Sequence, residues 1–220
     1  MKKLKDPVSG LTHLAWALLS IAGLVLLIIT ALKNGEGAWD VVSFSIFGAS
    51  LILLYTFSSV YHLCNVSEKA TVVLRKLDHI MIFFLIAGSY TPIALGPLRG
   101  PWGWSIFGVV WGIAFVGVFL TIFWLKAPRW TSTSLYLAMG WVVLIAIYPM
   151  IVTFKTAGAF GSLIWLLVGG IFYTIGGVIY GLKKPALKNK YFSFHEIFHI
   201  FVMLGSLCHW WFIYYHIVKI

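Results

Sequence analysis

Residues 14–32 read LAWALLSIAGLVLLIITAL, a run of 19 residues without a charged side chain. A helix needs about 20 apolar residues to cross the hydrocarbon core of a bilayer, which is about 30 Å thick. Three lysines precede the run, as they do in a secretory signal. The run is nevertheless too long for the apolar region of such a signal, and residues 33–37 contain no small-residue cleavage site. The stretch therefore predicts a retained first membrane span.

The rest of the chain repeats this pattern. Of its 220 residues, 61% are hydrophobic and 10% charged, and the mean hydropathy is +0.97, whereas soluble domains are about 25% charged. This composition excludes a water-soluble globule and leaves no room for a second, soluble domain. We expect an all-α polytopic membrane protein, one domain over residues 1–220, with seven transmembrane helices. They are placed at residues 13–32, 41–64, 78–96, 103–125, 134–154, 162–182 and 194–217.

The basic residues predict the orientation. With the N-terminus inside, twelve of the sixteen Lys and Arg residues fall in inner segments, which the positive-inside rule favours. We therefore expect a cytoplasmic N-terminus and an outer C-terminus. This bias also explains the net charge of +10, and no basic stripe alternates with aromatic residues, so we expect no nucleic-acid partner. The twelve are Lys2, Lys3, Lys5, Lys69, Arg75, Lys76, Lys126, Arg129, Lys183, Lys184, Lys188 and Lys190.

Small residues and prolines predict how the helices pack. Two G-x3-G pairs, at 108–112 and 177–181, are typical of faces where helices approach closely in lipid. Pro92 and Pro149 lie within spans and are expected to kink them, because each lacks a backbone N–H. The two cysteines form no metal or disulfide pattern, and we interpret both as small buried hydrophobes. They are Cys64 and Cys208.

Ionisable residues gather at one depth. An Asp, Lys or Arg at the middle of a span costs about 2.5 to 3.5 kcal/mol, and most of the expected spans contain none. The expected topology brings five ionisable residues to the cytoplasmic ends of spans two, three and seven. They are His62, Asp78, His195, Glu196 and His199.

Three of these residues predict a zinc site. His195 and His199 are four residues apart, so they share a helix face with a rise of about 6 Å between them. A single H-x3-H pair is weak evidence, but His62 adds a third imidazole from another helix at the same depth. Three histidines leave one position of a tetrahedral Zn²⁺ open, as in catalytic sites. We therefore predict a catalytic Zn²⁺ held by these three residues.

Two further residues are candidates for catalysis. Asp78 can hold the water and move its proton, or can orient a histidine ligand, and we favour these roles over its alternative as the N-cap of span three. Ser58 lies four residues before His62 and shares its helix face. It can donate a hydrogen bond to a ligand or oxyanion, or it can bond the i−4 carbonyl of its own helix; both readings stay open.

The remaining ionisable residues are given other roles. His13 either lines the cavity or is an ordinary interfacial histidine, and His79 is expected at the interface or behind the ligands. His209 lies about 15 Å along the helix from the ligands, so we expect packing or an outer-interface position there, as for His216. Glu196 points about 100° from the ligand face, which favours charge complementarity at a helix N-terminus.

Together the Ser58-x3-His62 pair, Asp78 and the His195-x3-His199 pair resemble the signature of the progestin and adiponectin receptor family. The short N-terminus and compact loops are similar to its bacterial branch, the hemolysin III proteins, and the resemblance covers essentially the whole chain. It implies zinc held by His62, His195 and His199 near the inner leaflet, with Asp78 beside it and Ser58 nearby. It also implies the bacterial inner (plasma) membrane. Without the long N-terminal extension of the receptor branch, a hormone-receptor role is not expected.

The family resemblance also supplies two classes of function. The receptor branch is associated with ceramidase activity, and the bacterial branch with red-cell lysis and membrane-lipid homeostasis. We expect a zinc-dependent intramembrane hydrolase that acts on a lipid amide or ester, with membrane lipid as its partner. The alternative is a pore-forming cytolysin or a non-catalytic membrane-state sensor with a structural zinc. A pore should carry polar residues along several helices, whereas the charges here gather at one end; a sensor would need the same histidines.

Overall fold

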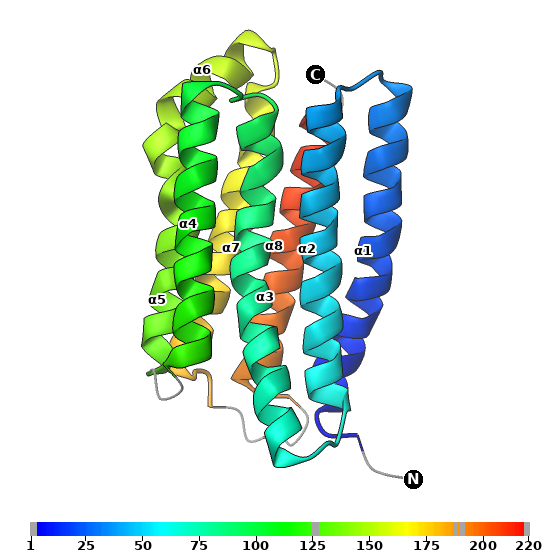
Figure 1. The fold of residues 1–220 in the computed structure, drawn as a ribbon, viewed down its shortest axis with the longest axis vertical. Coiled ribbons are helices and arrows are strands. Elements are labelled where there is room, and N and C mark those ends of the chain that lie inside the picture. The colour runs from blue at the N-terminus through cyan, green and yellow to red at the C-terminus, as the bar shows by residue number, and fades with distance from the viewer. Residues whose placement is uncertain (1–3, 125–127, 187–188, 190–191, 218–220) are drawn as a thin grey trace.

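The chain folds into an antiparallel bundle of long helices in the computed structural model (Figure 1). The structure describes residues 4–124, 128–186, 189 and 192–217, and this part of the chain contains no strand. The predicted all-α membrane protein is therefore confirmed. The elements are α1 (Pro7–Lys33), α2 (Ala38–Leu63), α3 (Glu68–Leu95), α4 (Pro101–Phe123), α5 (Arg129–Gly140), η1 (Trp141–Ala146), α6 (Ile147–Thr156), η2 (Phe160–Ser162), α7 (Leu163–Leu182), α8 (Phe194–Phe212) and η3 (Ile213–Ile217).

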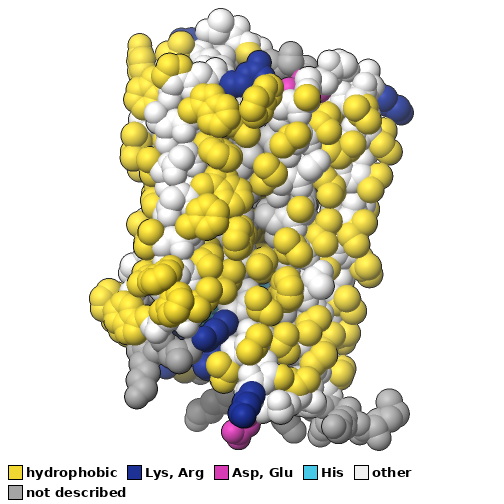
Figure 2. Space-filling view, viewed as in Figure 1, with side chains coloured by type: hydrophobic (Ala, Val, Ile, Leu, Met, Phe, Trp, Pro, Cys, Tyr) yellow, Lys and Arg dark blue, Asp and Glu magenta, His cyan; other side chains and the backbone are white. Residues whose placement is uncertain are grey.

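Within the described residues, seven helical segments run the length of the bundle, some of them made of more than one helix. Six are long and apolar enough to span a membrane, and one of these six combines α5, η1 and α6. The seventh segment is α3, which lies between α2 and α4 and is buried at every position from 87 to 95. Hydrophobic side chains cover the middle of the visible face, whereas Lys and Arg lie at its two ends (Figure 2). This distribution matches a protein whose middle faces lipid.

The two chain ends lie at opposite ends of the bundle, as seven crossings require (Figure 1). We refer to these as the N-terminal and C-terminal ends of the bundle. Five of the twelve residues behind the predicted orientation lie outside the described residues, so the structure adds nothing about them. They are Lys2, Lys3, Lys126, Lys188 and Lys190.

The start of α3 differs from the prediction. The helix begins at Glu68, ten residues before Asp78, and is capped by Ser67, whose Oγ accepts a hydrogen bond from the Ala70 N–H at 3.4 Å. The alternative interpretation of Asp78 as an N-cap is therefore wrong. Hydropathy marks where a chain enters the membrane, but Glu, Lys and Arg are good helix formers, and they extend α3 beyond that boundary.

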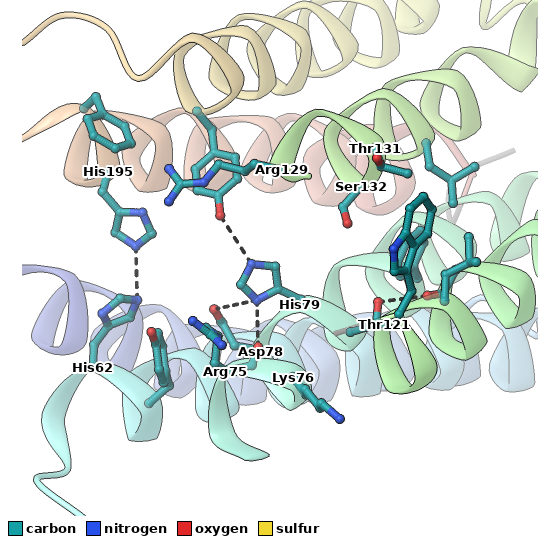
Figure 3. Close-up of a pocket in the computed structure, with 18 of the residues that line it drawn as sticks. His62, Arg75, Lys76, Asp78, His79, Thr121, Arg129, Thr131, Ser132 and His195 are labelled. Atoms are coloured by element: carbon teal, nitrogen blue, oxygen red, sulfur yellow. Dashed lines mark hydrogen bonds and ion pairs between the residues drawn. The ribbon is translucent and has the colours of Figure 1, made fainter. Parts of the chain in front are cut away.

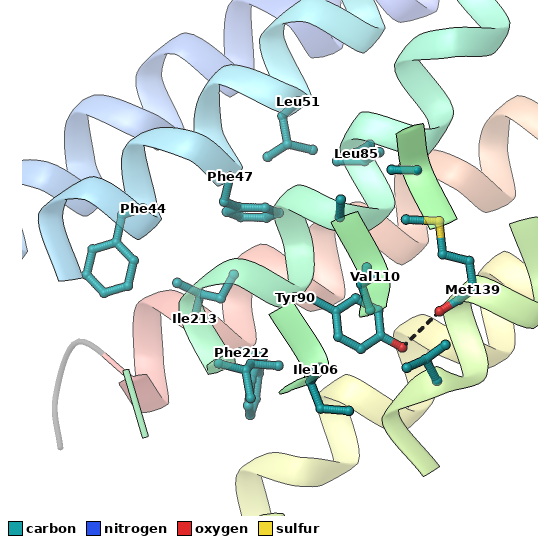
Figure 4. Close-up of a cluster of buried hydrophobic side chains, with 14 of the residues drawn as sticks. Phe44, Phe47, Leu51, Leu85, Tyr90, Ile106, Val110, Met139, Phe212 and Ile213 are labelled. Atoms are coloured by element: carbon teal, nitrogen blue, oxygen red, sulfur yellow. Dashed lines mark hydrogen bonds between the residues drawn. The ribbon is translucent and has the colours of Figure 1, made fainter. Parts of the chain in front are cut away.

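The fifth span is interrupted where Pro149 predicts a kink. The turns before it form the 3₁₀ helix η1, because proline has no N–H and its ring crowds the carbonyl of residue 145. The hydroxyl of Tyr90 in α3 forms hydrogen bonds to the backbone on both sides of this interruption (Figure 4). It donates to the carbonyls of Met139 and Gly140, at 3.2 and 2.6 Å, and accepts from the Val143 N–H at 2.9 Å. Pro92 lies inside α3, near its end.

One glycine prediction is confirmed and one is wrong. A methyl group added at Gly177 would meet Leu137, so this part of α7 packs closely on α5 as predicted. At Gly108 and Gly112 the same methyl group would meet nothing within 4 Å, so this pair makes no close contact. On α4 the close approaches occur instead at Gly103, against the carbonyls of Ala94 and Leu98, and at Gly117, against the ring of Phe83.

The cysteine interpretation is half right. Cys208 is buried, but Cys64 is exposed, because it follows the last residue of α2 and no longer lies within the bundle.

A dense apolar cluster packs the interior of the bundle (Figure 4). Phe44, Phe47 and Leu51 of α2 contribute to this cluster, and α8 and η3 supply Phe212 and Ile213. Its other end reaches the N-terminal end of the bundle, where Phe83 lines the cleft described below. The apolar core therefore borders the polar site.

Candidate metal centre

The three predicted ligands converge at the N-terminal end of the bundle. His62 lies in the last turn of α2, and His195 and His199 lie in the first two turns of α8. One candidate ligand nitrogen from each residue lies within 4.8 Å of the other two. The Nε2 atoms of His62 and His195 are 3.2 Å apart, with the two rings facing each other across the gap between their helices (Figure 3).

This geometry fits a tetrahedral metal ion. With Zn–N distances of about 2.0 to 2.1 Å, two ligand nitrogens lie about 3.3 to 3.4 Å apart, close to the 3.2 Å observed between His62 and His195. His62 and His199 are each only 3% exposed. The Nδ1 atom of His199 is buried and has no hydrogen-bond partner within the described residues. A buried set of imidazoles with an unsatisfied nitrogen is suited to bind a cation.

Asp6 orients one ligand, and the sequence analysis missed it. Its Oδ2 lies 3.1 Å from His62 Nδ1, and its backbone N–H donates to the His62 carbonyl at 2.8 Å. A proton on Nδ1 directed at this carboxylate leaves the Nε2 lone pair free for a metal. Fifty-six residues separate this pair. The sequence feature that could have pointed to Asp6 is its position directly before Pro7, at the expected depth of the site.

Glu196 stabilises the N-terminus of α8 through hydrogen bonds. It forms a capping box with Ser193, accepting from the Ser193 backbone N–H at 2.7 Å and from its hydroxyl at 2.6 Å. Its other carboxylate oxygen accepts from the Ser9 hydroxyl of α1 at 2.6 Å. The predicted role at the helix N-terminus is confirmed. These bonds also hold α1 against the turn that carries His195.

His13 of α1 is a fourth buried imidazole at the site. It is 3% exposed and stacks on His199, with ring centroids 3.8 Å apart and planes 13° apart. Because the lone pairs of two stacked rings lie in parallel planes, they cannot point at one ion, and the geometry excludes His13 as a ligand beside His199. Neither of its nitrogens has a hydrogen-bond partner within the described residues. Of the two interpretations of His13, the cavity-lining one is confirmed.

Two hollows meet at the histidines. An inner cavity of about 120 Å³ is lined by polar residues at one end and by apolar side chains elsewhere. A cleft of about 620 Å³ opens at the N-terminal end of the bundle (Figure 3). Asp78 and His195 line both hollows, so they lie where the two meet. The polar residues of the inner cavity include His13, Ser58, Asp78, His195 and His199.

An apolar pocket continues from the inner cavity toward the C-terminal end of the bundle, where it reaches Phe160 and Gly161 of η2. Its volume is about 370 Å³, and it shares Ser89, Tyr90 and Trp141 with the inner cavity. Its remaining walls come largely from η1, α6 and α7. An apolar passage next to buried imidazoles can take the hydrocarbon part of a ligand while a polar group stays near the histidines.

The other histidines have separate roles. His79 Nδ1 lies 2.7 Å from the Arg75 carbonyl and its Nε2 lies 3.3 Å from the Tyr180 hydroxyl, so both nitrogens are engaged, as expected for a residue behind the ligands. His209 Nε2 donates to the Leu166 carbonyl at 3.3 Å, which confirms a packing role. The side chain of His216 lies outside the described part of the chain.

The fold and the site define a class: seven-helix membrane proteins with a histidine cluster at one end of the bundle. The chain matches the family model "Haemolysin-III related" over residues 1–210, and it belongs to that family, as its motifs predicted. It is 40% identical to the "Hemolysin-3 homolog" of Bacillus subtilis, over 98% of this chain and 96% of that protein.

Two further relatives extend the comparison. The "Hemolysin-3" of Bacillus cereus is 36% identical, over 92% of this chain and 87% of its own length. The human "Monocyte to macrophage differentiation factor" is 25% identical, over 85% and 75%. The similarity therefore covers most of the bundle in bacterial and animal proteins.

Proposed function

We propose that the protein is a zinc-dependent hydrolase that acts, within the bacterial inner membrane, on an amide or ester bond of a membrane lipid. The observation that carries this proposal is the convergence of three histidines, with candidate ligand nitrogens within 4.8 Å of one another, on a cavity that is also lined by Asp78 and Ser58. A zinc ion held by three imidazoles lowers the pKa of a bound water to about 7 and polarises a carbonyl.

The protein groups have distinct tasks in this proposal. Asp78 is 8% exposed and borders both hollows, so its carboxylate can accept a proton in the inner cavity and pass it to the solvated cleft. Ser58 comes from α2 and is 1% exposed. Its hydroxyl would donate a hydrogen bond to the carbonyl oxygen of the scissile bond as negative charge develops there. The catalytic roles of Asp78 and Ser58 are part of the proposal.

The hollows suit a lipid substrate. The apolar pocket would receive an acyl chain, the inner cavity would hold the scissile bond, and the cleft would leave the polar part of the lipid in water. Pockets for small molecules usually occupy about 300 to 1,000 Å³, and the cleft and the apolar pocket fall within this range. A role in membrane-lipid homeostasis would follow from such an activity.

Two measurements on the purified protein test the proposal. We expect about one zinc per chain, lost in His199→Ala, because two imidazoles hold zinc far more weakly than three. The control is His209→Gln, a buried histidine of the same helix outside the ligand set. We also expect release of fatty acid from a short-chain ceramide, abolished in Asp78→Asn. Bound zinc without activity on a broad panel of lipid amides and esters would contradict the hydrolase proposal and favour the structural-zinc sensor.

Membrane lysis is the second candidate, because the printed name of the Bacillus cereus relative suggests it. Release of dye from liposomes would test it. Leakage that persists in Asp78→Asn would favour a cytolysin, whereas no leakage at a protein level that supports hydrolysis would exclude lysis as the primary activity.

A further inference from the structure

The cleft carries a pair of arginines that the proposed chemistry does not use. Arg75 projects from α3 and Arg129 from the first turn of α5, and the two face the cleft from different walls (Figure 3). Tyr61 and Tyr180 line the same cleft as the two arginines. Two cations from separate helices are therefore directed into one space.

Neither guanidinium is neutralised by the protein. Within the described residues, no carboxylate oxygen lies within 4.0 Å of Arg75 or Arg129. Two of the acids that share the cleft are engaged elsewhere: Asp6 with His62, and Glu196 with serine hydroxyls. The third acid of the cleft, Asp78, lies 4.0 Å from His79 Nδ1 and forms no ion pair with either arginine within the described residues.

Arg129 is held in position by an aromatic ring. Its guanidinium carbon lies 5.0 Å from the ring centroid of Tyr180, within the range of a cation–π contact. This contact fixes the side chain while its N–H groups stay available. The ammonium group of Lys76, in contrast, donates a hydrogen bond to the Ile122 carbonyl at 3.0 Å, in the last turn of α4. The unused cations of the cleft are the two arginines.

Hydroxyl donors lie beside Arg129. Thr131 and Ser132 follow it in the first two turns of α5, and both line the cleft. The Oγ1 atom of Thr131 is buried and has no hydrogen-bond partner within the described part of the chain. Guanidinium and hydroxyl donors together match the oxygens of a phosphate group, which arginine binds through two parallel N–H···O bonds.

We propose that this cleft binds a phosphate group between Arg75 and Arg129, and that the physiological ligand is a phosphate-bearing lipid. The volume of about 620 Å³ admits a lipid head group, and the inner leaflet that the predicted orientation places here is anionic. The phosphate would lie at the mouth of the cleft and the hydrocarbon would lead inward past the histidines. The phosphate-bearing lipid is a substrate only if the proposed hydrolase function holds. The binding of the phosphate group does not depend on that function.

Ether lipids separate binding from hydrolysis, because they contain no amide or ester. The purified protein would be titrated with a short-chain dialkylglycerol phosphate and with the matching uncharged dialkylglycerol. We expect the phosphate to increase affinity by about tenfold or more, since charge-assisted, bidentate hydrogen bonds from arginine to phosphate are stronger than neutral ones. The double variant Arg75→Gln/Arg129→Gln should lose most of this difference, and each single variant should lose part of it.

Lys69→Gln is the matched control. It removes one positive charge from the same helix, at an exposed site outside the cleft, and should bind like the unmodified protein. Equal affinity for the two ether lipids, or equal losses in Lys69→Gln and Arg75→Gln, would overturn the proposal. Thermal unfolding of each variant shows whether a loss reflects misfolding.

Glycerol 3-phosphate distinguishes the sources of the phosphate. Displacement of the ether lipid at millimolar concentration would show that a soluble phosphate ester suffices, whereas no displacement would show that the site needs a lipid. Arginine-dependent binding with no hydrolysis of any phospholipid would refute the hydrolase alone. Hydrolysis of ceramide with no arginine-dependent phosphate binding would refute the phosphate site alone.

Discussion

Asp6 would favour the tautomer of His62 that the proposed zinc site needs, because a carboxylate 3.1 Å from Nδ1 favours a proton there and leaves Nε2 free. Partners behind a ligand typically change metal affinity by about 10- to 100-fold. We therefore expect Asp6→Ala to weaken zinc binding by about that factor, and Asp6→Asn, which keeps an acceptor oxygen, to weaken it less. Competition with a chromophoric chelator measures this affinity.

The control for this prediction is Asp40→Ala, which removes an acid from the first turn of α2, at the other end of that helix. Its zinc affinity should equal that of the unmodified protein. An unchanged affinity in Asp6→Ala would show that His62 is oriented by its helix alone.

His13 gives a second prediction for a single residue. Phenylalanine keeps a ring against His199 and removes two buried nitrogens that lack partners. We expect His13→Phe to retain about one zinc per chain. Its unfolding temperature should be unchanged or higher, because burying an unpaired polar group costs about 1 to 3 kcal/mol. Metal analysis and thermal unfolding test this; loss of zinc would mean that His13 is itself a ligand.

The sequence predicted the site residues whose signal is local. The spacing of His195 and His199 puts them on one helix face whatever the tertiary structure, and the depth of His62 follows from counting spans. Asp6 directly precedes α1 and His13 belongs to it, and no spacing reveals the position of α1 beside α2 and α8. Their contacts depend on tertiary packing, so the sequence could offer at most a shared depth in the membrane.

Hydropathy located the membrane-spanning helices but not the residues at which they begin and end. Helix α3 starts ten residues before the predicted span, because a helix can continue into water on polar residues. The G-x3-G pattern likewise predicted close packing at Gly177 but failed at Gly112. A glycine allows a close approach without requiring one, so the pattern alone cannot say which helix face meets a neighbour.

The break in the fifth span gives a prediction at the scale of the helices. The Tyr90 hydroxyl adds hydrogen bonds to two carbonyls and one N–H at the 3₁₀ segment. Tyr90→Phe would remove these bonds from the interior of the bundle, so we expect the free energy of unfolding to fall by about 0.5 to 1.5 kcal/mol. Unfolding in detergent, followed by circular dichroism, measures the change.

Tyr148→Phe provides the matched control for Tyr90→Phe. Tyr148 lies in α6 close to the same break, but its side chain is 76% exposed on the surface of the bundle. Its substitution should change stability little. Equal effects of the two substitutions would show that the bonds of Tyr90 do not stabilise the break.

For the whole molecule, the polar site lies at one end of the bundle. The three predicted ligands, the cleft and its cations lie at the N-terminal end, and the apolar core extends from beside them toward the C-terminal end. A substrate that needs both lipid and water would reach such a site from the N-terminal end. The proposals consequently require that end to face the cytoplasm, where the anionic leaflet lies, and the charge bias predicts this orientation.

Cys64 provides a direct test of that orientation. It is an exposed free thiol just after α2, at the N-terminal end of the bundle, whereas Cys208 is buried. A membrane-impermeant maleimide should label the protein in inverted vesicles and leave it unlabelled in intact cells, because the reagent reaches Cys64 only from the cytoplasmic face.

The reverse experiment uses Ala157→Cys in a Cys64→Ser background, since Ala157 is exposed beyond α6 at the C-terminal end of the bundle. This thiol should react in intact cells. Labelling of Cys64 from outside would reverse the topology and place the arginine cleft in a leaflet poor in anionic lipid. The phosphate-lipid proposal would then lose its source of ligand, although the histidine geometry, which does not depend on sidedness, would still favour a metal.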